Sequence, residues 1–160
     1  MKQTTLCYLI KDGKALMLHR IKKKDDINHD KWIGIGGKFE HGESPEECMQ
    51  REFLEETGLA LLDARYRGIV TFLSDDWCEY MHLFTAEQSV GEIRECDEGA
   101  LEWIAWETLT SLPIWEGDKV FLRLLETRDS FFSLKLVYDG EHLVRVMLDG
   151  RELARGQWGI

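Results

Sequence analysis

Residues 45–57 carry the start and stop signals of a helix, and this helix constrains how the rest of the chain can pack. Ser44 is a favourable N-cap, Pro45 suits the first helical position, and Gly58 suits the C-terminal stop. The apolar stripe of the expected helix is narrow and consists chiefly of Met49 and Phe53. Such a helix buries one side in a core and leaves its other sides free for chemistry.

Three carboxylates share one face of this expected helix, at positions i, i+3 and i+4: Glu52, Glu55 and Glu56. Like charges at this spacing repel by a few tenths of a kcal/mol per pair. On the helical wheel the neighbouring Arg51 points elsewhere, so we expect no cation among them. An isolated pattern of this kind is more often a solvated helix face. With too few partners, however, it offers the oxygen ligands that a hard divalent cation prefers.

The segment just before the helix strengthens the functional interpretation. Residues 34–37 read Gly-Ile-Gly-Gly and follow the apolar pair Trp32-Ile33. We expect a glycine-rich turn here, because glycine lets the backbone approach a ligand or metal closely. Glycine clusters alone mostly mark ordinary loops, so the turn gains meaning only together with the acidic helix.

Strand signals outnumber helix signals in the rest of the chain. Asp12-Gly13 and Asp139-Gly140 suit tight turns and predict two hairpins, which join 6–10 to 15–18 and 132–138 to 143–147. Runs rich in aromatic and β-branched residues predict further strands at 66–73, 80–84 and 101–105. A second helix is expected over 117–127, with its buried side formed by Val120, Phe121, Leu124 and Leu125. These elements predict an α+β fold in which helices pack on a mixed sheet.

Composition excludes several classes of protein. Apolar residues make up 44% and charged residues 31% of the 160 residues, which is globular composition. A net charge of -10 disfavours sequence-independent binding to DNA or RNA, although it allows a small phosphate ligand carried by a metal. No run approaches the ~18 apolar residues of a membrane span, and the first residues lack the apolar segment of a signal peptide. We therefore expect one cytoplasmic domain over 1–160, without nucleic-acid or membrane partners.

Gly37, Glu43 and residues 51–59 together reproduce the spacing G-x5-E-x7-R-E-U-x-E-E-x-G-U, in which U is an aliphatic residue. This pattern resembles the Nudix box, here residues 37–59, and every fixed residue type is present. One aliphatic position holds Phe53, which is still apolar. The chain is thus similar to the Nudix hydrolases, which use water and Mg²⁺ or Mn²⁺ to hydrolyse a nucleoside diphosphate linked to another group. The resemblance implies an α/β/α sandwich with the box as a loop–helix–loop motif.

The resemblance also implies roles for individual residues. The metal would be bound by carboxylates and one backbone carbonyl: Glu52, Glu55, Glu56, Glu98 and the carbonyl of Gly36. Arg51 would pair with Glu43 and hold the loop against the helix. A carboxylate would take the proton of the attacking water, with Glu56 favoured over Glu52 and Glu98.

Beyond the box, the chain resembles the MutT-like branch that acts on oxidised purine nucleoside triphosphates. The resemblance covers most of residues 3–149 and lies chiefly in 32–38, 95–98 and 112–118. It implies that Trp115 stacks on the base and that Asp118 accepts a hydrogen bond from its polar edge. The other candidate substrate contacts lie in the glycine segment and in the basic run that directly precedes the substrate-entry loop, from which the triphosphate could be reached: Trp32, Ile33, Gly37, Lys38, Arg20 and Lys23.

This chain departs from that branch at two positions. Ile33 stands where the branch often has a base-binding Asn, and Gly117 stands where some members carry a second Asp. One Asp and no Asn leave fewer ways to recognise two purine edges. Bacterial MutT-type proteins that resemble this chain share its W-E-G-D sequence at 115–118 and its hairpin at 131–140. The resemblance therefore implies 8-oxo-dGTP as the substrate, hydrolysed to 8-oxo-dGMP and pyrophosphate as part of nucleotide pool sanitation.

Several interpretations stay open from the sequence. The box is equally compatible with another nucleoside diphosphate derivative such as ADP-ribose. A Nudix-fold binding module is a weaker alternative because such modules usually lose box acids, and RNA cap processing is disfavoured by the net charge. Trp115 and Trp32 are also compatible with plain core packing, and Arg20 and Lys23 with a solvated strand end. The segment 150–160 is a C-terminal tail to which the sequence assigns no role.

Overall fold

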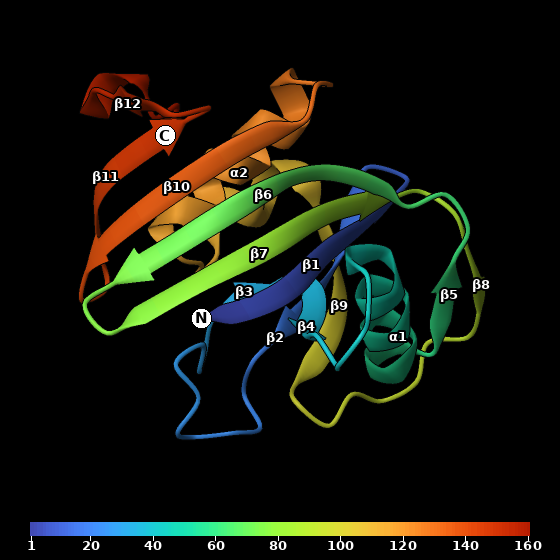
Figure 1. The fold of residues 1–160 in the computed structure, drawn as a ribbon. Helices are drawn as coiled ribbons and strands as arrows, with labels where there is room; N and C mark the ends of the chain where they lie inside the picture. Colours follow the sequence, from blue (N-terminus) through green and yellow to red (C-terminus); the bar gives the residue numbers. More distant parts are fainter.

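The computed structural model describes residues 1–160 as a mixed β-sheet with one helix on each face (Figure 1). The two helices are α1 (Pro45–Thr57) and α2 (Glu116–Thr127), and two short 3-10 helices are η1 (Trp106–Ser111) and η2 (Arg155–Gln157). The strands of the large sheet are β1 (Lys2–Lys11), β2 (Lys14–His19), β3 (Trp32–Ile33), β4 (Ile35–Lys38), β6 (Arg65–Ser74), β7 (Trp77–Ala86), β9 (Ala100–Ala105), β10 (Phe132–Asp139), β11 (His142–Leu148) and β12 (Arg151–Leu153). Strands β5 (Leu59–Leu61) and β8 (Ser89–Gly91) form a separate pair. This α/β/α arrangement confirms the predicted α+β class.

The sheet is mixed, as predicted, and its strand order is β12-β11-β10-β6-β7-β1-β2-β3. Strand β1 runs parallel to β7 and β10 runs parallel to β6, whereas the other pairs are antiparallel. Both predicted Asp-Gly hairpins are present, as β1–β2 and β10–β11. The predicted strands at 66–73, 80–84 and 101–105 lie within β6, β7 and β9.

Strand β1 alternates between two hydrophobic cores, one on each face of the sheet. Leu6 and Tyr8 pack with α2, whereas Cys7 and Leu9 pack with the α1 stripe. The alternation follows from the two-residue period of a strand, which sends neighbouring side chains to opposite faces. The α1 face therefore carries the acidic helix, and the α2 face carries Trp115.

Helix α1 begins and ends where its capping residues predict. The Ser44 hydroxyl accepts a hydrogen bond from the Glu47 amide at 3.1 Å. At the other end Gly58 adopts a φ of 83° and donates its N–H to the Leu54 carbonyl. Cys48 and Thr57 are buried beside the predicted apolar stripe. The caps thus fix where the helix begins and ends, and with it the side of the helix on which the three carboxylates lie.

The prediction of a glycine-rich turn at 34–37 is wrong. Ile35–Lys38 is strand β4, paired antiparallel with β1 in a register that places Gly36 opposite Leu6 and Gly37 opposite Thr5. A Cβ at Gly36 would overlap the carbonyl oxygen of Thr5, so glycine is needed for this close backbone approach. The glycines serve strand packing here, which a cluster of turn-forming residues does not reveal.

The C-terminal tail folds onto α2. Asp149-Gly150 forms a third hairpin, which joins β11 to β12 and which the sequence analysis did not predict. After it, Trp158 is 6% exposed within the α2 core, and Arg155 lies over its ring at 5.0 Å. None of the helices is long and apolar enough to cross a membrane.

Candidate active site

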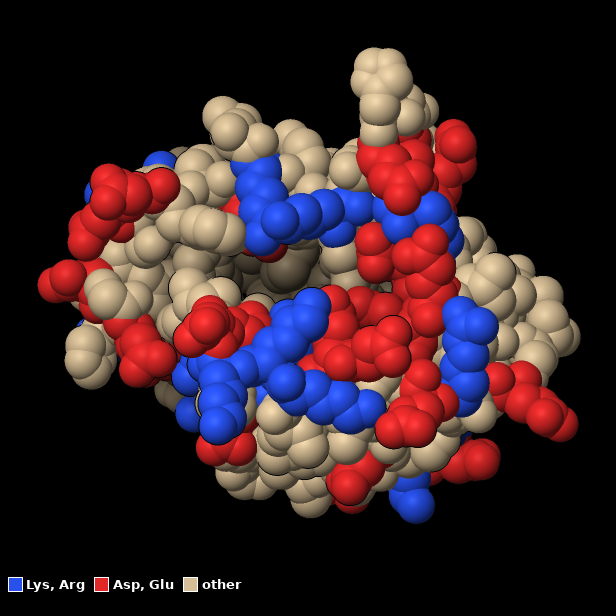
Figure 2. Space-filling view, turned by 90° about the horizontal axis from the view of Figure 1, so that it is seen from below, with Lys and Arg blue, Asp and Glu red and all other residues tan.

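Acidic side chains gather at one border of a hollow on the face that carries the 20–31 loop, at the bottom of Figure 1. Figure 2 shows this face, with Lys and Arg side chains above and below the hollow and acidic side chains to its right. The acids of the box come from α1 and the loop before it, and Glu98 comes from the segment before β9. Residues far apart in the sequence therefore meet on this face.

Arg51 holds the box together through its guanidinium group. Its Nε and Nη2 donate to the two carboxylate oxygens of Glu43 at 2.6 and 2.9 Å, and Nη2 also donates to the Lys38 carbonyl at 2.9 Å. These hydrogen bonds, together with the Glu40 backbone, lower the pKa of Glu43 to about 2. This forked pairing fastens the loop to the helix, because a guanidinium matches a carboxylate in two places.

The expectation that Arg51 points away from the helical carboxylates is wrong. Its Nη1 donates to Glu52 at 2.8 Å and to Glu55 at 3.2 Å. Glu55 is the i+4 neighbour of Arg51, and the arginine side chain is long enough to reach sideways to its next residue. Arg51 therefore donates hydrogen bonds to three carboxylates, and it also forms an ion pair with Glu40 at 3.6 Å. Glu56 is not among the partners of Arg51.

Gly37 of β4 lies directly against the Glu52 carboxylate, where a Cβ would overlap it. Burial raises the pKa of Glu52, and the hydrogen bond from Arg51 opposes this rise. Glycine at this position lets a backbone strand and a carboxylate meet without a side chain between them. The structure thus brings Gly37 and Glu52 together, with Gly36 next to them in the same strand.

Glu56 is the most deeply buried carboxylate of the helix face. Its Oε2 atom is buried and has no hydrogen-bond partner. Burial, followed by hydrogen bonding to the Glu98 carboxyl group, raises the pKa of Glu56 to about 9. Unpartnered buried oxygens of this kind cost about 1–3 kcal/mol unless a ligand satisfies them.

Glu98 is held beside Glu56 by cations of the loop after β2. Arg20 Nη1 donates to Glu98 at 2.9 Å, and Lys23 Nζ lies 3.6 Å from the other Glu98 oxygen. Lys23 is largely exposed, whereas the Arg20 side chain is mostly buried. The structure therefore brings both predicted cations to the acidic cluster, where they contact Glu98.

The side chains around Glu56 have the donor chemistry of a hard-cation site, but they are not arranged as a closed set of ligands. Glu52 and Glu98 lie near enough to act on the Glu56 carboxyl group, and the buried Oε2 of Glu56 has no hydrogen-bond partner. No group of three or more Asp, Glu, His or Cys side chains is placed so that it could hold a metal ion. Glu55 is more exposed, at 57% of its side chain, and stands at the edge of this cluster. The residues present thus offer oxygen ligands of the kind that Mg²⁺ prefers, and binding a metal would require their side chains to move closer together.

Trp115, the N-cap residue of α2, lies on the α2 face of the sheet and is only 8% exposed. Its ring meets Phe72 and Tyr138 edge-on, with centroids 5.8 and 5.5 Å apart. Its indole Nε1 donates to Asn28 Oδ1 at 2.7 Å, and the Lys31 ammonium lies over its ring at 4.7 Å. The indole is therefore held by two aromatic rings and by Asn28, and the Lys31 ammonium lies over one of its ring faces.

Asp118 lies in the first turn of α2, close to Trp115, and is 9% exposed. Burial raises its pKa to about 8, although the nearby Lys31 opposes the shift. A carboxyl group with such a pKa is a hydrogen-bond donor as well as an acceptor at neutral pH. The structure thus places a protonatable polar group near the indole.

The remaining predicted residues lie in different places. Trp32 stacks on His19 at 4.3 Å and packs against the α2 core, so it lies on the same face as Trp115. Ile33 packs against the α1 core, and the structure does not bring it together with Trp115. The Lys38 side chain is exposed, and its carbonyl is the group that contacts Arg51.

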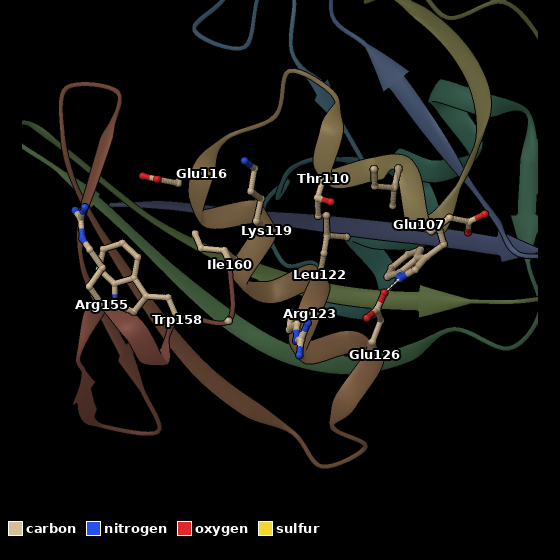
Figure 3. A pocket seen from close by; sticks show the side chains of 13 residues that line it. Glu107, Thr110, Glu116, Lys119, Leu122, Arg123, Glu126, Arg155, Trp158 and Ile160 are labelled. Atoms are coloured by element: carbon tan, nitrogen blue, oxygen red, sulfur yellow. Dashed lines mark hydrogen bonds between the residues drawn. The ribbon is translucent and has the colours of Figure 1, made fainter.

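A cavity of about 560 Å³ lies away from these residues, between the outer side of α2, η1 and the C-terminal tail (Figure 3). Trp158 and Ile160 of the tail and Leu122 of α2 line it, together with charges of both signs. None of the predicted site residues lines it. This cavity therefore lies where the C-terminal tail packs against α2, and it is separate from the acidic cluster.

Sequence reasoning missed the residues that hold Trp115 and Asp118 in place. Asn28 and Lys31 contact the indole, and Tyr138 accepts a hydrogen bond from the Gly117 amide at 2.6 Å. The signal available was the polar stretch 25–31 between a basic run and the Trp32-Ile33 pair. Its contact with Trp115 spans 87 positions in the chain, which no local pattern indicates.

The comparisons with known proteins identify the class of the chain as a hydrolase that acts on pyrophosphate bonds. The model of the NUDIX domain matches residues 1–125, so the chain belongs to the Nudix hydrolases. Members of this family act on small nucleotide substrates and generally use divalent metals such as Mg²⁺. The predicted family resemblance is thereby confirmed.

Individual relatives support a MutT-like member of the family. The chain is 31% identical over 126 residues to the Nudix hydrolase YvcI of Bacillus subtilis, covering 74% of this chain and 75% of that protein. It is 30% identical over 134 residues to the oxidized purine nucleoside triphosphate hydrolase of Danio rerio, covering 82% and 84%. The crystal structure of a MutT protein from Bacillus halodurans superposes with a TM-score of 0.82 at 27% identity, covering 93% and 98%.

Proposed function

We propose that this protein is a Mg²⁺-dependent pyrophosphohydrolase of oxidised purine nucleoside triphosphates, with 8-oxo-dGTP as its first substrate and 8-oxo-dGMP and pyrophosphate as its products. Mn²⁺ would be the substitute metal. The observation that carries the proposal is the protonatable Asp118 close to Trp115 at the start of α2. The zebrafish relative, whose name states this substrate class, covers most of the chain and supports it.

The acidic cluster would hold the metal through Glu52, Glu55, Glu56, Glu98 and the carbonyl of Gly36. A bound Mg²⁺ neutralises phosphate charge and makes a coordinated water more acidic. Arg51 and Glu43 keep the loop in place, so the carboxylates stay in register while substrate binds.

Glu56 is the proposed base that takes the proton of the attacking water, with Glu52 and Glu98 as alternatives. Its buried Oε2 has no protein partner, and the positive charge of a metal bound beside it would lower the pKa that burial raises, so that the carboxylate could accept a proton. Arg20 and Lys23 lie on the Glu98 side of the cluster and supply positive charge for the triphosphate.

Base recognition would use the opposite end of the site. For a purine to stack on Trp115, the Lys31 side chain has to leave the ring face, which its flexible stem permits. Stacking on an aromatic ring contributes about 1–3 kcal/mol per base. Asp118 would then pair with the polar edge of the base, as a buried carboxyl group that can both donate and accept.

The test is kcat/KM with Mg²⁺ for 8-oxo-dGTP, dGTP and ADP-ribose, with pyrophosphate release measured separately. We expect a strong preference for 8-oxo-dGTP and release of pyrophosphate. A preference for ADP-ribose, or equal values for the three, would refute the proposed substrate and leave only the family activity.

The Glu56→Gln variant tests the catalytic assignment in the same assay. Glutamine has the same shape and cannot take a proton, so we expect kcat to fall by roughly 10²–10⁴-fold while the melting temperature stays unchanged. A variant with near-normal kcat would remove Glu56 from the mechanism. Glu47→Gln, an exposed change on the same helix, is the matched control.

A further inference from the structure

Asp26 lies at the centre of the 20–31 loop and accepts hydrogen bonds on both of its carboxylate oxygens. Arg20 Nε donates to Oδ2 at 2.6 Å, and the Asn28 amide donates to Oδ1 at 3.1 Å. The Asp26 side chain is only 10% exposed, although Lys22–Asp25 before it are all exposed. Because the neighbouring side chains are exposed, the burial of the Asp26 carboxylate depends on its two hydrogen-bond partners, Arg20 and Asn28.

One branch of these contacts leads from Asp26 to the acidic cluster. Arg20, held by Asp26 through Nε, uses its Nη1 to donate to Glu98 at 2.9 Å. Glu98 is the member of the acidic cluster that this branch reaches. Because a guanidinium is planar and rigid, fixing its Nε edge also fixes the direction of its Nη1 hydrogen bond.

The other branch leads from Asp26 to Trp115. The backbone N–H of Asn28 donates a hydrogen bond to Asp26, and the side-chain Oδ1 of Asn28 accepts one from the indole N–H of Trp115 at 2.7 Å. A buried indole N–H needs a partner, and Asn28 supplies it. Asp26 therefore stands where the contacts to the acids and to the indole meet.

We propose that Asp26 is a positioning residue that couples the two ends of the active site, holding Arg20 against Glu98 on one side and Asn28 against Trp115 on the other. Asp26 itself touches neither phosphate nor base. The effect of Asp26 on turnover rests on the proposed function. Its effect on the positions of Arg20 and Asn28 does not depend on that proposal. The loop has no helix or strand of its own between β2 and β3. Backbone hydrogen bonds such as Arg20 N–H to the Lys31 carbonyl close its ends, and the Asp26 side chain links its interior to Arg20 and Asn28.

The kinetic test compares three variants with the parent, using 8-oxo-dGTP and Mg²⁺. Asn28→Ala removes only the indole branch, so KM rises roughly 10-fold while kcat stays within about twofold. Asp26→Ala removes both branches, so KM rises equally and kcat falls roughly 10–100-fold. Asp25→Ala, the exposed neighbour with the same change in charge, leaves both constants unchanged.

The double variant separates positioning from a general loss of folded protein. If Asp26 acts on the base through Asn28, adding Asn28→Ala to Asp26→Ala raises KM no further. A reduced folded fraction would instead lower the apparent kcat and leave KM at the parent value. Additive changes in KM, or an Asp26→Ala variant with parent constants, would overturn the proposal.

A second readout is independent of substrate. In ¹H–¹⁵N spectra the indole N–H signal of Trp115, assigned from a Trp115→Phe spectrum, should shift in Asp26→Ala and in Asn28→Ala but not in Asp25→Ala. If the parent enzyme is inactive on 8-oxo-dGTP, only the proposed function is refuted. The spectra still test whether Asp26 is coupled to Trp115, because they need no substrate. An unmoved Trp115 signal in Asp26→Ala would refute the coupling itself.

Discussion

Replacing Asp118 by asparagine tests whether the start of α2 buries an acid that keeps its proton. Burial raises the pKa of Asp118 from 3.8 to about 8, and Lys31 opposes the shift. The folded state thus holds the proton more tightly than the unfolded chain does. The free energy of unfolding therefore falls as the pH rises between these two pKa values, and the stabilising contribution is fully present only below the lower one. Asparagine keeps the shape of the side chain and cannot ionise, so the variant escapes this loss.

The size of the effect follows from the width of that pH window. Each pH unit inside it lowers the free energy of unfolding by at most about 1.4 kcal/mol. Between about pH 5.5 and 8 the full loss is about 3 kcal/mol, and residual contact of the 9% exposed side chain with water reduces it to about 2 kcal/mol. Over the same pH interval, the free energy of unfolding of the Asp118→Asn variant should rise relative to that of the parent by this amount.

The assay is urea denaturation of parent and variant at several pH values, because their difference cancels every other titrating group. We expect the difference to grow with pH and to level off above pH 8 or so. Asp25→Asn, which changes an exposed carboxylate, should give curves parallel to the parent. Parallel curves for Asp118→Asn would show that the carboxylate is ionised in the fold, and the reasoning about its burial would be wrong.

Two further changes test the box and the tail. The Arg51→Lys variant cannot form the forked pair with Glu43, so kcat should fall roughly 10–100-fold in the 8-oxo-dGTP assay. Its control is Lys119→Arg, a change outside the acidic cluster that should leave kcat unaltered. Trp158→Ala should lower the free energy of unfolding in urea by about 3–5 kcal/mol because the indole is 6% exposed in the α2 core. Ile160→Ala, at the exposed end of the same tail, should stay within about 0.5 kcal/mol, and equal losses would contradict the docking of Trp158.

The local elements were predictable because their signals lie within a few residues of each other. Ser44 and Gly58 cap α1 where expected, and the Asp-Gly pairs at 12–13 and 139–140 form their hairpins. Side-chain capping and positive φ are properties of short segments, so the sequence alone carries them. The mixed sheet followed from the surplus of strand signals over helix signals.

Contacts between distant segments were not predictable in this way. Gly34–Gly37 looked like a turn, yet the lack of a Cβ at Gly36 serves its close approach to Thr5 in β1. Arg51 looked isolated on the helical wheel, yet its long side chain reaches two carboxylates beside it. In both cases the deciding neighbour becomes visible only when elements pack, because one-dimensional spacing does not describe side-chain reach.

The same packing explains why position 117 does not carry a second aspartate beside Asp118. A Cβ at Gly117 would lie 2.5 Å from Leu136 Cδ1 and 2.6 Å from the Tyr138 hydroxyl, which accepts the Gly117 amide hydrogen bond. An aspartate therefore does not fit at position 117 while Tyr138 of β10 occupies this place. Gly117→Ala should lower the free energy of unfolding in urea by about 1–3 kcal/mol through overpacking. Combining it with Tyr138→Phe, which removes one of the two clashing atoms, should cost less than the sum of the single changes. Strict additivity would show that Tyr138 does not exclude the second acid, and the restriction of the pocket to Asp118 would need another cause.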